Sequence, residues 1–208
     1  NTSGVFNSLE QMIGDKAKLF MDTWRNKQLE YSFRRGLMNK YTVFSVCTKD
    51  SLEFCCKMFK TDLSIGQKEA LMDEYSVLPT FADVDTGLKN LKESGHKLFA
   101  FSNGSEKAVS KLLTNAKIID RFDGIISVDG VEIFKPSPLV YEYFNKETNS
   151  TKSDSWLISS NPFDVIGAIS YGMRSAWVQR SQDSIFDPWG IEPTAIINKL
   201  TDLCLKLE

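Results

Sequence analysis

The sequence predicts an α/β protein with a doubly wound parallel-sheet core and a helical cap. About the first 80 residues show only helical periodicity, whereas the remainder alternates short apolar strands with amphipathic helices. With 42% hydrophobic and 25% charged residues, the 208-residue chain has the composition of a globular protein that buries a sizeable core. We therefore expect a helical cap over residues 1–80 and an α/β core over residues 81–208.

The cap is expected to contain a long amphipathic helix. Side chains spaced at i, i+4 form a stripe on one face of this helix. The stripe consists of Arg25, Leu29, Phe33, Leu37, Tyr41 and Phe44. Helical patterns follow at residues 49–60 and 66–75, and Pro79 closes the region. We expect the stripe from Arg25 to face the carboxyl edge of the sheet.

In the core, nearly continuous apolar strands predict a parallel sheet that helices cover on both faces. The expected strands span residues 96–102, 124–127, 155–159 and 174–178. The expected helices span residues 83–94, 105–116, 138–146, 161–171 and 194–207.

A cap that is inserted early in a doubly wound core needs a core strand before it. Only Asn1–Gly4 precede the cap here, and they are too few and too polar for a buried strand. The first core strand is therefore expected to be missing from these 208 residues. Its loss would leave backbone groups unpaired on its neighbours, so we expect direct pairing, another segment or a second chain to close the gap.

The net charge and the lengths of the apolar runs limit which kinds of binding partner are expected. A net charge of −2 gives no electrostatic reason to expect nucleic acid or an anionic membrane, and no apolar run approaches the roughly 20 residues of a membrane span. The expected partners are a small molecule and, at most, a second copy of the chain in a homodimer. Four cysteines without a C-x-x-C pair predict buried free thiols, which fit a cytoplasmic location.

In open α/β sheets, reactive groups gather at the carboxyl ends of the strands. The first expected strand ends at Ser102-Asn103-Gly104-Ser105, where the glycine allows backbone amides to turn toward an anion and Ser105 can cap the next helix. The alternative is an ordinary turn between a strand and a helix.

Two further strand ends carry polar groups. Lys135 is followed by Pro136 and could balance carboxylate charge at the edge of the sheet, although taken alone a solvated lysine explains it better, because such lysines before prolines are common. After the strand at residues 155–159, Ser159 and Asn161 offer hydrogen bonds, and Asp164 lies in the first turn of a helix. The alternative role of Asp164 is a favourable interaction with the helix dipole.

In this order, the three segments resemble motifs two, three and four of the haloacid dehalogenase superfamily, which implies a HAD-like Rossmannoid core. Longer stretches resemble the L-2-haloacid dehalogenases over essentially the whole chain. These stretches are Trp24-Arg25-Asn26-Lys27-Gln28-Leu29-Glu30-Tyr31, Leu98-Phe99-Ala100-Phe101-Ser102-Asn103-Gly104-Ser105, Phe134-Lys135-Pro136 with Val140-Tyr141, and Ser159-Ser160-Asn161 with Asp164 and Gly167-Ala168.

The resemblance implies an activity that releases halide from 2-haloacids without cofactor or metal. An aspartate in a D-x-x-G-T motif attacks the halogen-bearing carbon, and water then hydrolyses the ester. By this resemblance, Lys135 would keep the nucleophile ionised, and Asp164 would position the hydrolytic water and Lys135 together with Asn161 and Ser159.

The same resemblance assigns the substrate contacts. Arg25 and Asn103 would receive the halide, and Ser102 would bind the substrate carboxylate. Leu29, Phe44 and Phe163 would form an apolar wall. The residue pattern alone also allows Arg25 to pair with a core carboxylate.

The nucleophile itself is not in the chain. A count without gaps back from Trp24 places Asn1 on the last residue of the first motif, so the aspartate would lie upstream. By the resemblance, the missing strand lies between the strands that end at Ser102 and Ser159. Truncation or processing, natural loss, and omitted residues each explain this, and the 208 residues are expected to be inactive alone.

Two other functions stay open. A non-catalytic protein could keep the HAD fold for binding or scaffolding. A magnesium-dependent phosphatase of the same superfamily usually has two acidic residues in the fourth motif, because Mg²⁺ prefers oxygen ligands. Only Asp164 is present in this loop.

Overall fold

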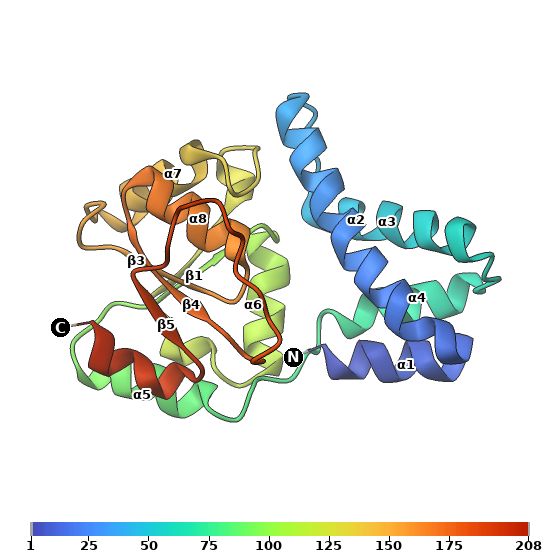
Figure 1. Ribbon diagram of the computed structural model, residues 1–208, viewed down its shortest axis with the longest axis horizontal. Helices are drawn as coiled ribbons and strands as arrows, with labels where there is room; N and C mark the ends of the chain where they lie inside the picture. Colours follow the sequence, from blue (N-terminus) through green and yellow to red (C-terminus); the bar gives the residue numbers. More distant parts are fainter. Residues whose placement is uncertain (1, 208) are drawn as a thin grey trace. The chain divides into compact units, whose positions relative to one another are not determined.

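The computed structural model describes residues 2–207 and divides them into two compact units. The first unit contains the residues up to Thr80 together with Asn103–Ile119, and the second contains Phe81–Ser102 and the residues from Asp120 onward. Figure 1 labels the elements of both units.

The first unit is built from helices alone, as predicted for the start of the chain. Its elements are α1 (Ser3–Ile13), a 3₁₀ turn η1 (Gly14–Lys16), α2 (Ala17–Leu37), α3 (Phe44–Phe59), α4 (Ile65–Glu74) and α6 (Glu106–Asn115). Trp24 of α2 lies in the apolar core that α1, α2, α3 and α4 share. Its ring is fully buried, meets the Tyr75 ring edge-on at 5.3 Å, and donates from Nε1 to the Thr48 carbonyl over 2.8 Å.

The face that α2 buries within the first unit lies beside the predicted stripe. The buried face of the helix is the neighbouring stripe of Phe20, Trp24, Gln28, Ser32 and Gly36, whereas Leu37 is 86% exposed. Gln28 and Ser32 can be buried because each has a hydrogen-bond partner: Gln28 donates to Thr48 Oγ1, and Ser32 donates to the Leu29 carbonyl.

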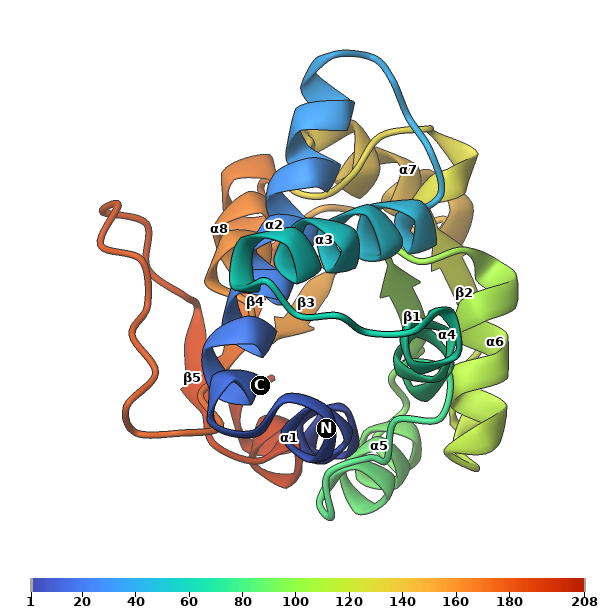
Figure 2. The same cartoon turned by 90° about the vertical axis from the view of Figure 1, so that its right-hand side faces the viewer.

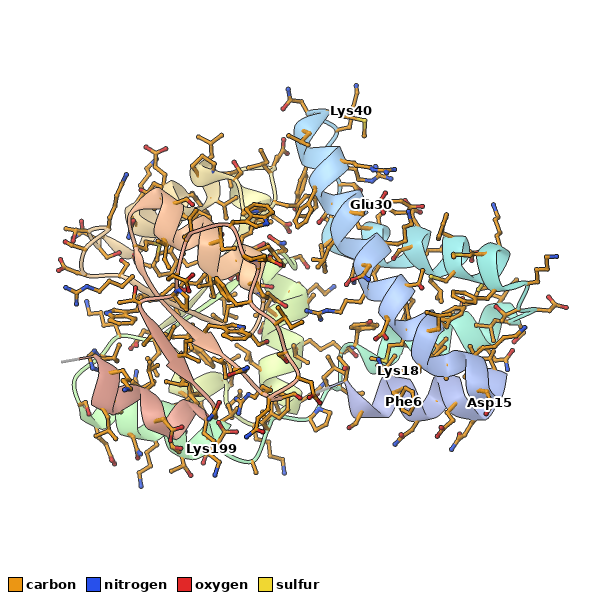
Figure 3. All side chains as sticks on the ribbon, in the orientation of Figure 1. Phe6, Asp15, Lys18, Glu30, Lys40 and Lys199 are labelled. Carbon is orange, nitrogen blue, oxygen red and sulfur yellow. The ribbon has the colours of Figure 1, made fainter. Side chains whose placement is uncertain are left out.

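The helix also ends earlier than predicted, so Tyr41 and Phe44 are not on it. Asn39 adopts a left-handed φ of 53°, and Lys40 N–H donates back to the Arg35 carbonyl over 2.9 Å, which is the geometry of a helix stop. Lys40, labelled in Figure 3, lies just beyond this stop, and Phe44 begins α3.

The second unit alternates strands and helices. Its elements are α5 (Val84–Glu93), β1 (Phe99–Ser102), β2 (Gly124–Ser127), the 3₁₀ turn η3 (Val128–Gly130), α7 (Pro138–Thr148), β3 (Trp156–Ser159), α8 (Pro162–Tyr171), β4 (Arg174–Val178), β5 (Ala195–Ile197) and the 3₁₀ helix η4 (Leu200–Lys206); η2 (Ile119–Arg121) spans the boundary between the units. The four predicted strands are all present, and every pairing is parallel, which confirms the α/β class.

The strands form two sheets, with the orders β1-β2 and β3-β4-β5. Figure 2 shows the same grouping, with β1 beside β2 and β3 beside β4. Within residues 2–207, neither direct pairing of β1 with β3 nor another segment closes the gap that was expected between them. Closure by a second chain stays a prediction.

The end of the chain was predicted as one helix over residues 194–207, and this is wrong. Ala195–Ile197 form β5, which pairs with Ala176–Val178 of β4, and the 3₁₀ helix η4 follows. Burial explains the difference: as a strand, the segment places Ile197 in an apolar cluster with Val178, while Leu203 of η4 fills the same cluster.

Asp83, just before α5, ties this tail to the unit. Its carboxylate accepts hydrogen bonds from Arg180 Nη1 at 2.8 Å and from the Leu200 N–H at 2.6 Å. Burial by itself would raise the pKa of Asp83, but these hydrogen bonds outweigh it and hold that pKa below the usual value.

Two further findings concern the whole described chain. No helix in it combines the length and the apolar character that a membrane span requires. All four cysteines are free, and Cys47, Cys55 and Cys56 are buried, whereas Cys204 is only partly buried.

We expect Gly87→Ala to destabilise the protein by about 1–3 kcal/mol, because an added methyl group forces an overpacked contact. A Cβ at this position of α5 would lie 2.8 Å from Leu200 Cγ and 3.0 Å from the Leu200 backbone carbon. The measurement is the free energy of unfolding in urea. Gly66→Ala is the control, because nothing lies within 4 Å of its Cβ position, and it should be neutral or slightly stabilising. Equal stability of the two variants would contradict the packing of α5 on η4.

Candidate functional site

The site residues of the second unit follow strands β1 and β3. Ser102 ends β1 and is half-buried. Ser159 ends β3, and its Oγ accepts a hydrogen bond from the Asn161 N–H over 3.1 Å. Pro162 then begins α8, where its missing N–H leaves no hydrogen bond unmade. This local sequence places Asp164 in the first turn of α8, directly beyond the carboxyl end of β3.

Lys135 and Asp164 form a buried ion pair. Lys135 Nζ lies 3.2 Å from Asp164 Oδ2, and the two side chains are only 6% and 8% exposed. The same ammonium donates to the Phe101 carbonyl of β1 over 3.0 Å and lies 4.0 Å from the centroid of the Phe101 ring. The solvated lysine considered from the sequence is therefore excluded, because Lys135 is held between the Phe101 carbonyl of β1 and the Asp164 carboxylate of α8.

Tyr141 of α7 completes the environment of Asp164. Its hydroxyl lies 3.1 Å from Asp164 Oδ1 and 3.2 Å from the Asp164 backbone carbonyl. Burial raises the pKa of Tyr141, and the negative charge of Asp164 raises it further, so the hydroxyl stays protonated and donates. Both carboxylate oxygens of Asp164 thus have a fixed donor.

The close approach of α7 and α8 depends on a glycine. A Cβ on Gly167 would lie 2.4 Å from the Tyr141 hydroxyl and 2.7 Å from Pro136 Cβ. Any larger residue would push Tyr141 or the Lys135-Pro136 segment away from Asp164. Pro136 follows a cis peptide bond, and Pro138 starts α7.

Sequence reasoning missed the two residues that hold this pair in place. Phe101 supplies a backbone carbonyl and a ring face to Lys135, neither of which a side-chain motif reveals. Tyr141 had a signal, because it lies one turn into the helix that follows Lys135-Pro136, and a tyrosine on a buried helix face needs a partner for its hydroxyl.

The remaining predicted site residues are divided between the units. Asn161 and Phe163 lie on the β3–α8 segment with Asp164, and both are half-buried. Arg25, Leu29, Phe44 and Asn103 belong to the first unit. There, Arg25 is exposed on α2 and its charge acts on Tyr75, whose pKa burial raises to about 12.

The arrangement provides one buried ammonium and one buried carboxylate, from Lys135 and Asp164, and not a set of side chains that would bind a metal. A buried ammonium at the end of two strands can stabilise a carboxylate or an anionic substrate, and a carboxylate with both oxygens fixed can orient water. Within residues 2–207, no three His, Cys, Asp or Glu side chains come together as metal ligands would.

Comparison with known proteins identifies the family. The family model described as haloacid dehalogenase-like hydrolase matches residues 13–178. An (S)-2-haloacid dehalogenase of Pseudomonas fluorescens is 34% identical over 203 residues, which cover 98% of this chain and 89% of that protein. Another, from Pseudomonas sp. (strain YL), is 36% identical over 170 residues, covering 82% of this chain and 73% of the relative.

Solved structures agree with the sequence relatives. The L-2-haloacid dehalogenase of Xanthobacter autotrophicus superimposes with a TM-score of 0.89 at 27% identity, covering 98% of this chain and 91% of that one. A second L-2-haloacid dehalogenase gives a TM-score of 0.95 at 26% identity and covers 100% of this chain and 92% of its own. The chain therefore belongs to the haloacid dehalogenase-like hydrolases and, within them, to the L-2-haloacid dehalogenase family.

Proposed function

We propose that this chain carries the site of a hydrolase that removes halide from a 2-haloacid, or acts on another small carboxylate, through an aspartyl ester. The observation that carries this proposal is the buried Lys135–Asp164 pair at the carboxyl ends of β1 and β3. Relatives named (S)-2-haloacid dehalogenase support it, since one of them is 34% identical over almost the whole chain.

The reaction divides into two steps. A carboxylate on a D-x-x-G-T segment, which these 208 residues do not contain, attacks the carbon that bears the halogen. The carbon–halogen bond breaks, halide leaves with the electron pair, and an ester forms; water then hydrolyses the ester. The positive charge of Lys135 keeps the nucleophile ionised, and Asp164, with Asn161 and Ser159, orients the water and Lys135.

The other predicted residues bind the substrate in this proposal. Ser102 donates to the substrate carboxylate, and Arg25 and Asn103 receive the departing halide. The apolar wall consists of Leu29, Phe44 and Phe163. Residues 1–80 act as the cap and residues 81–208 as the core.

Cellular context belongs to the same proposal. Four free thiols, three of them buried, fit a reducing compartment such as the cytoplasm. The partner is the small-molecule substrate, without a cofactor, and any protein partner is a second copy of the chain.

We expect the 208-residue chain alone to release no halide from L-2-chloropropionate, because orienting groups cannot form the ester without the nucleophile. A version that carries a family first strand and D-x-x-G-T ahead of Asn1 should turn over repeatedly. The measurement is chloride release with purified protein. The matched control is the extended chain with Asn in place of the added aspartate, which should be inactive.

Other outcomes would point to other functions. Multiple turnovers by the unextended chain that are abolished by Asp164→Asn would make Asp164 the nucleophile and reject the proposed roles. Phosphate release that requires Mg²⁺ would favour the phosphatase. An extended chain that folds but has neither activity would favour a binding or scaffold protein.

We further expect a double-mutant cycle to reveal the strength of the buried pair. Lys135→Met should destabilise the protein by about 3–5 kcal/mol, because it leaves the Asp164 carboxylate buried without its cation. Adding Asp164→Asn should recover much of this loss. In the extended chain, by contrast, the double variant should stay inactive. Unfolding in urea and chloride release provide the two readouts.

The control cycle uses Lys89 and Glu93, whose side chains are 56% and 63% exposed and 3.7 Å apart. Its coupling energy should be about 0.5 kcal/mol or less, as for other exposed helix pairs. Two cycles of equal size would show that burial does not distinguish the Lys135–Asp164 pair.

A further inference from the structure

We propose that Trp177 of β4 is a positioning residue for the hydrolysis of the ester, because it holds the turn between β3 and α8 in place. The inference rests on the proposed function, in which Ser159, Asn161 and Asp164 of this segment orient the water. Trp177 acts on them through the backbone: its indole N–H donates to the Ser160 carbonyl, in the middle of the turn, over 3.3 Å.

The register of the two strands brings Trp177 to the turn. In the parallel pairing of β3 and β4, Trp177 lies opposite Ser159, the last residue of β3. Alternate residues of a strand point to the same side of the sheet, so Trp177 shares a face with Ser175. Ser175 Oγ donates to the Leu157 carbonyl of β3 over 2.8 Å. This face of β4 therefore bonds twice to the neighbouring segment, and the bond from Trp177 lies just beyond the end of β3.

The bond from Trp177 differs from the bonds that the turn makes with itself. The Asn161 N–H donates to Ser159 Oγ over 3.1 Å, and the Asn161 carbonyl accepts from the Asp164 N–H over 3.1 Å. Both of these bonds join residues of the same segment. Since the indole donor belongs to β4, it is the one among these three bonds that fixes the turn relative to another strand.

Packing holds the indole ring and leaves the acceptor accessible. Trp177 is only 4% exposed, and its ring meets the Phe186 ring, from the connection between β4 and β5, at a centroid distance of 5.2 Å. Ser160, by contrast, is exposed. Water can therefore replace a lost indole donor at the Ser160 carbonyl, so the loss should cost little stability while it frees the turn to move.

Only the second step of the reaction uses the water that this turn orients. The water oxygen bonds to the ester carbonyl carbon, and the bond from that carbon to the substrate oxygen breaks. The substrate oxygen takes one proton of the water and becomes a hydroxyl, the other proton passes to solvent, and the nucleophile returns as a carboxylate. A displaced turn should therefore slow hydrolysis more than ester formation, because it misplaces the attacking water.

The test quenches the extended chain during turnover of saturating L-2-chloropropionate and measures the ratio of ester-bearing to free chain by mass spectrometry. This ratio equals the rate of ester formation divided by the rate of hydrolysis. Trp177→Phe should raise it roughly tenfold, the effect of one lost hydrogen bond. Benzothienylalanine at position 177, in which sulfur replaces the N–H of a ring of the same size, should give the same rise. Unfolded chain counts as free chain and lowers the ratio, so poor folding cannot imitate the result.

The matched control is Ser175→Ala, which removes the other side-chain bond from this face of β4 and should leave the ratio close to that of the parent. In the 208-residue chain, hydrogen exchange of the Asn161 and Asp164 amides should become faster in Trp177→Phe and not in Ser175→Ala. An unchanged ratio in both Trp177 replacements, or an equal rise in Ser175→Ala, would overturn the inference. Absence of halide release from the extended parent chain would instead reject the proposed function, so the two failures are distinct.

Discussion

The ion pair between Lys135 and Asp164 is the contact on which the second unit depends. Removing both charges from water costs several kcal/mol for each ion, so the surrounding structure has to supply compensating groups. It does so from separate elements: the Phe101 carbonyl of β1 accepts from Lys135, and the Tyr141 hydroxyl of α7 donates to Asp164 on α8. These interactions hold β1, α7 and α8 together around one pair of charges.

Packing around the pair follows from the same requirement. Tyr141 reaches Asp164 because Gly167 leaves room between α7 and α8, and the Phe101 ring lies against the Lys135 ammonium where water would otherwise solvate it. Gly167 is therefore the residue that allows Tyr141 to approach Asp164. The Lys135–Asp164 pair is thus buried and hydrogen-bonded at both ends.

Sequence patterns predicted the strands and helices of the second unit better than the contacts between them. Apolar strands followed by Ser102 and Ser159 were recognisable because burial on both faces requires continuous apolar residues. The contact between Lys135 and the Phe101 carbonyl was not, since backbone acceptors carry no residue signature. In α2, the face buried within the first unit could not be predicted from apolar residues alone, because hydrogen bonds allow polar Gln28 and Ser32 to be buried. At the end of the chain, residues 195–197 pair with β4 although their sequence has helical periodicity. Pairing with a distant strand leaves no local sequence pattern, so it could not be predicted.

Phe101 belongs both to strand β1 and to the environment of the Lys135–Asp164 pair. Phe101 lies on β1, which within residues 2–207 pairs with β2 alone, and its carbonyl is the acceptor that holds Lys135 at the end of that strand. The first core strand that the family resemblance implies between β1 and β3 would thus end beside the Lys135 ammonium. A carboxylate at its carboxyl end would gain a nearby positive charge in a buried setting, where Coulomb attraction is much stronger than in water.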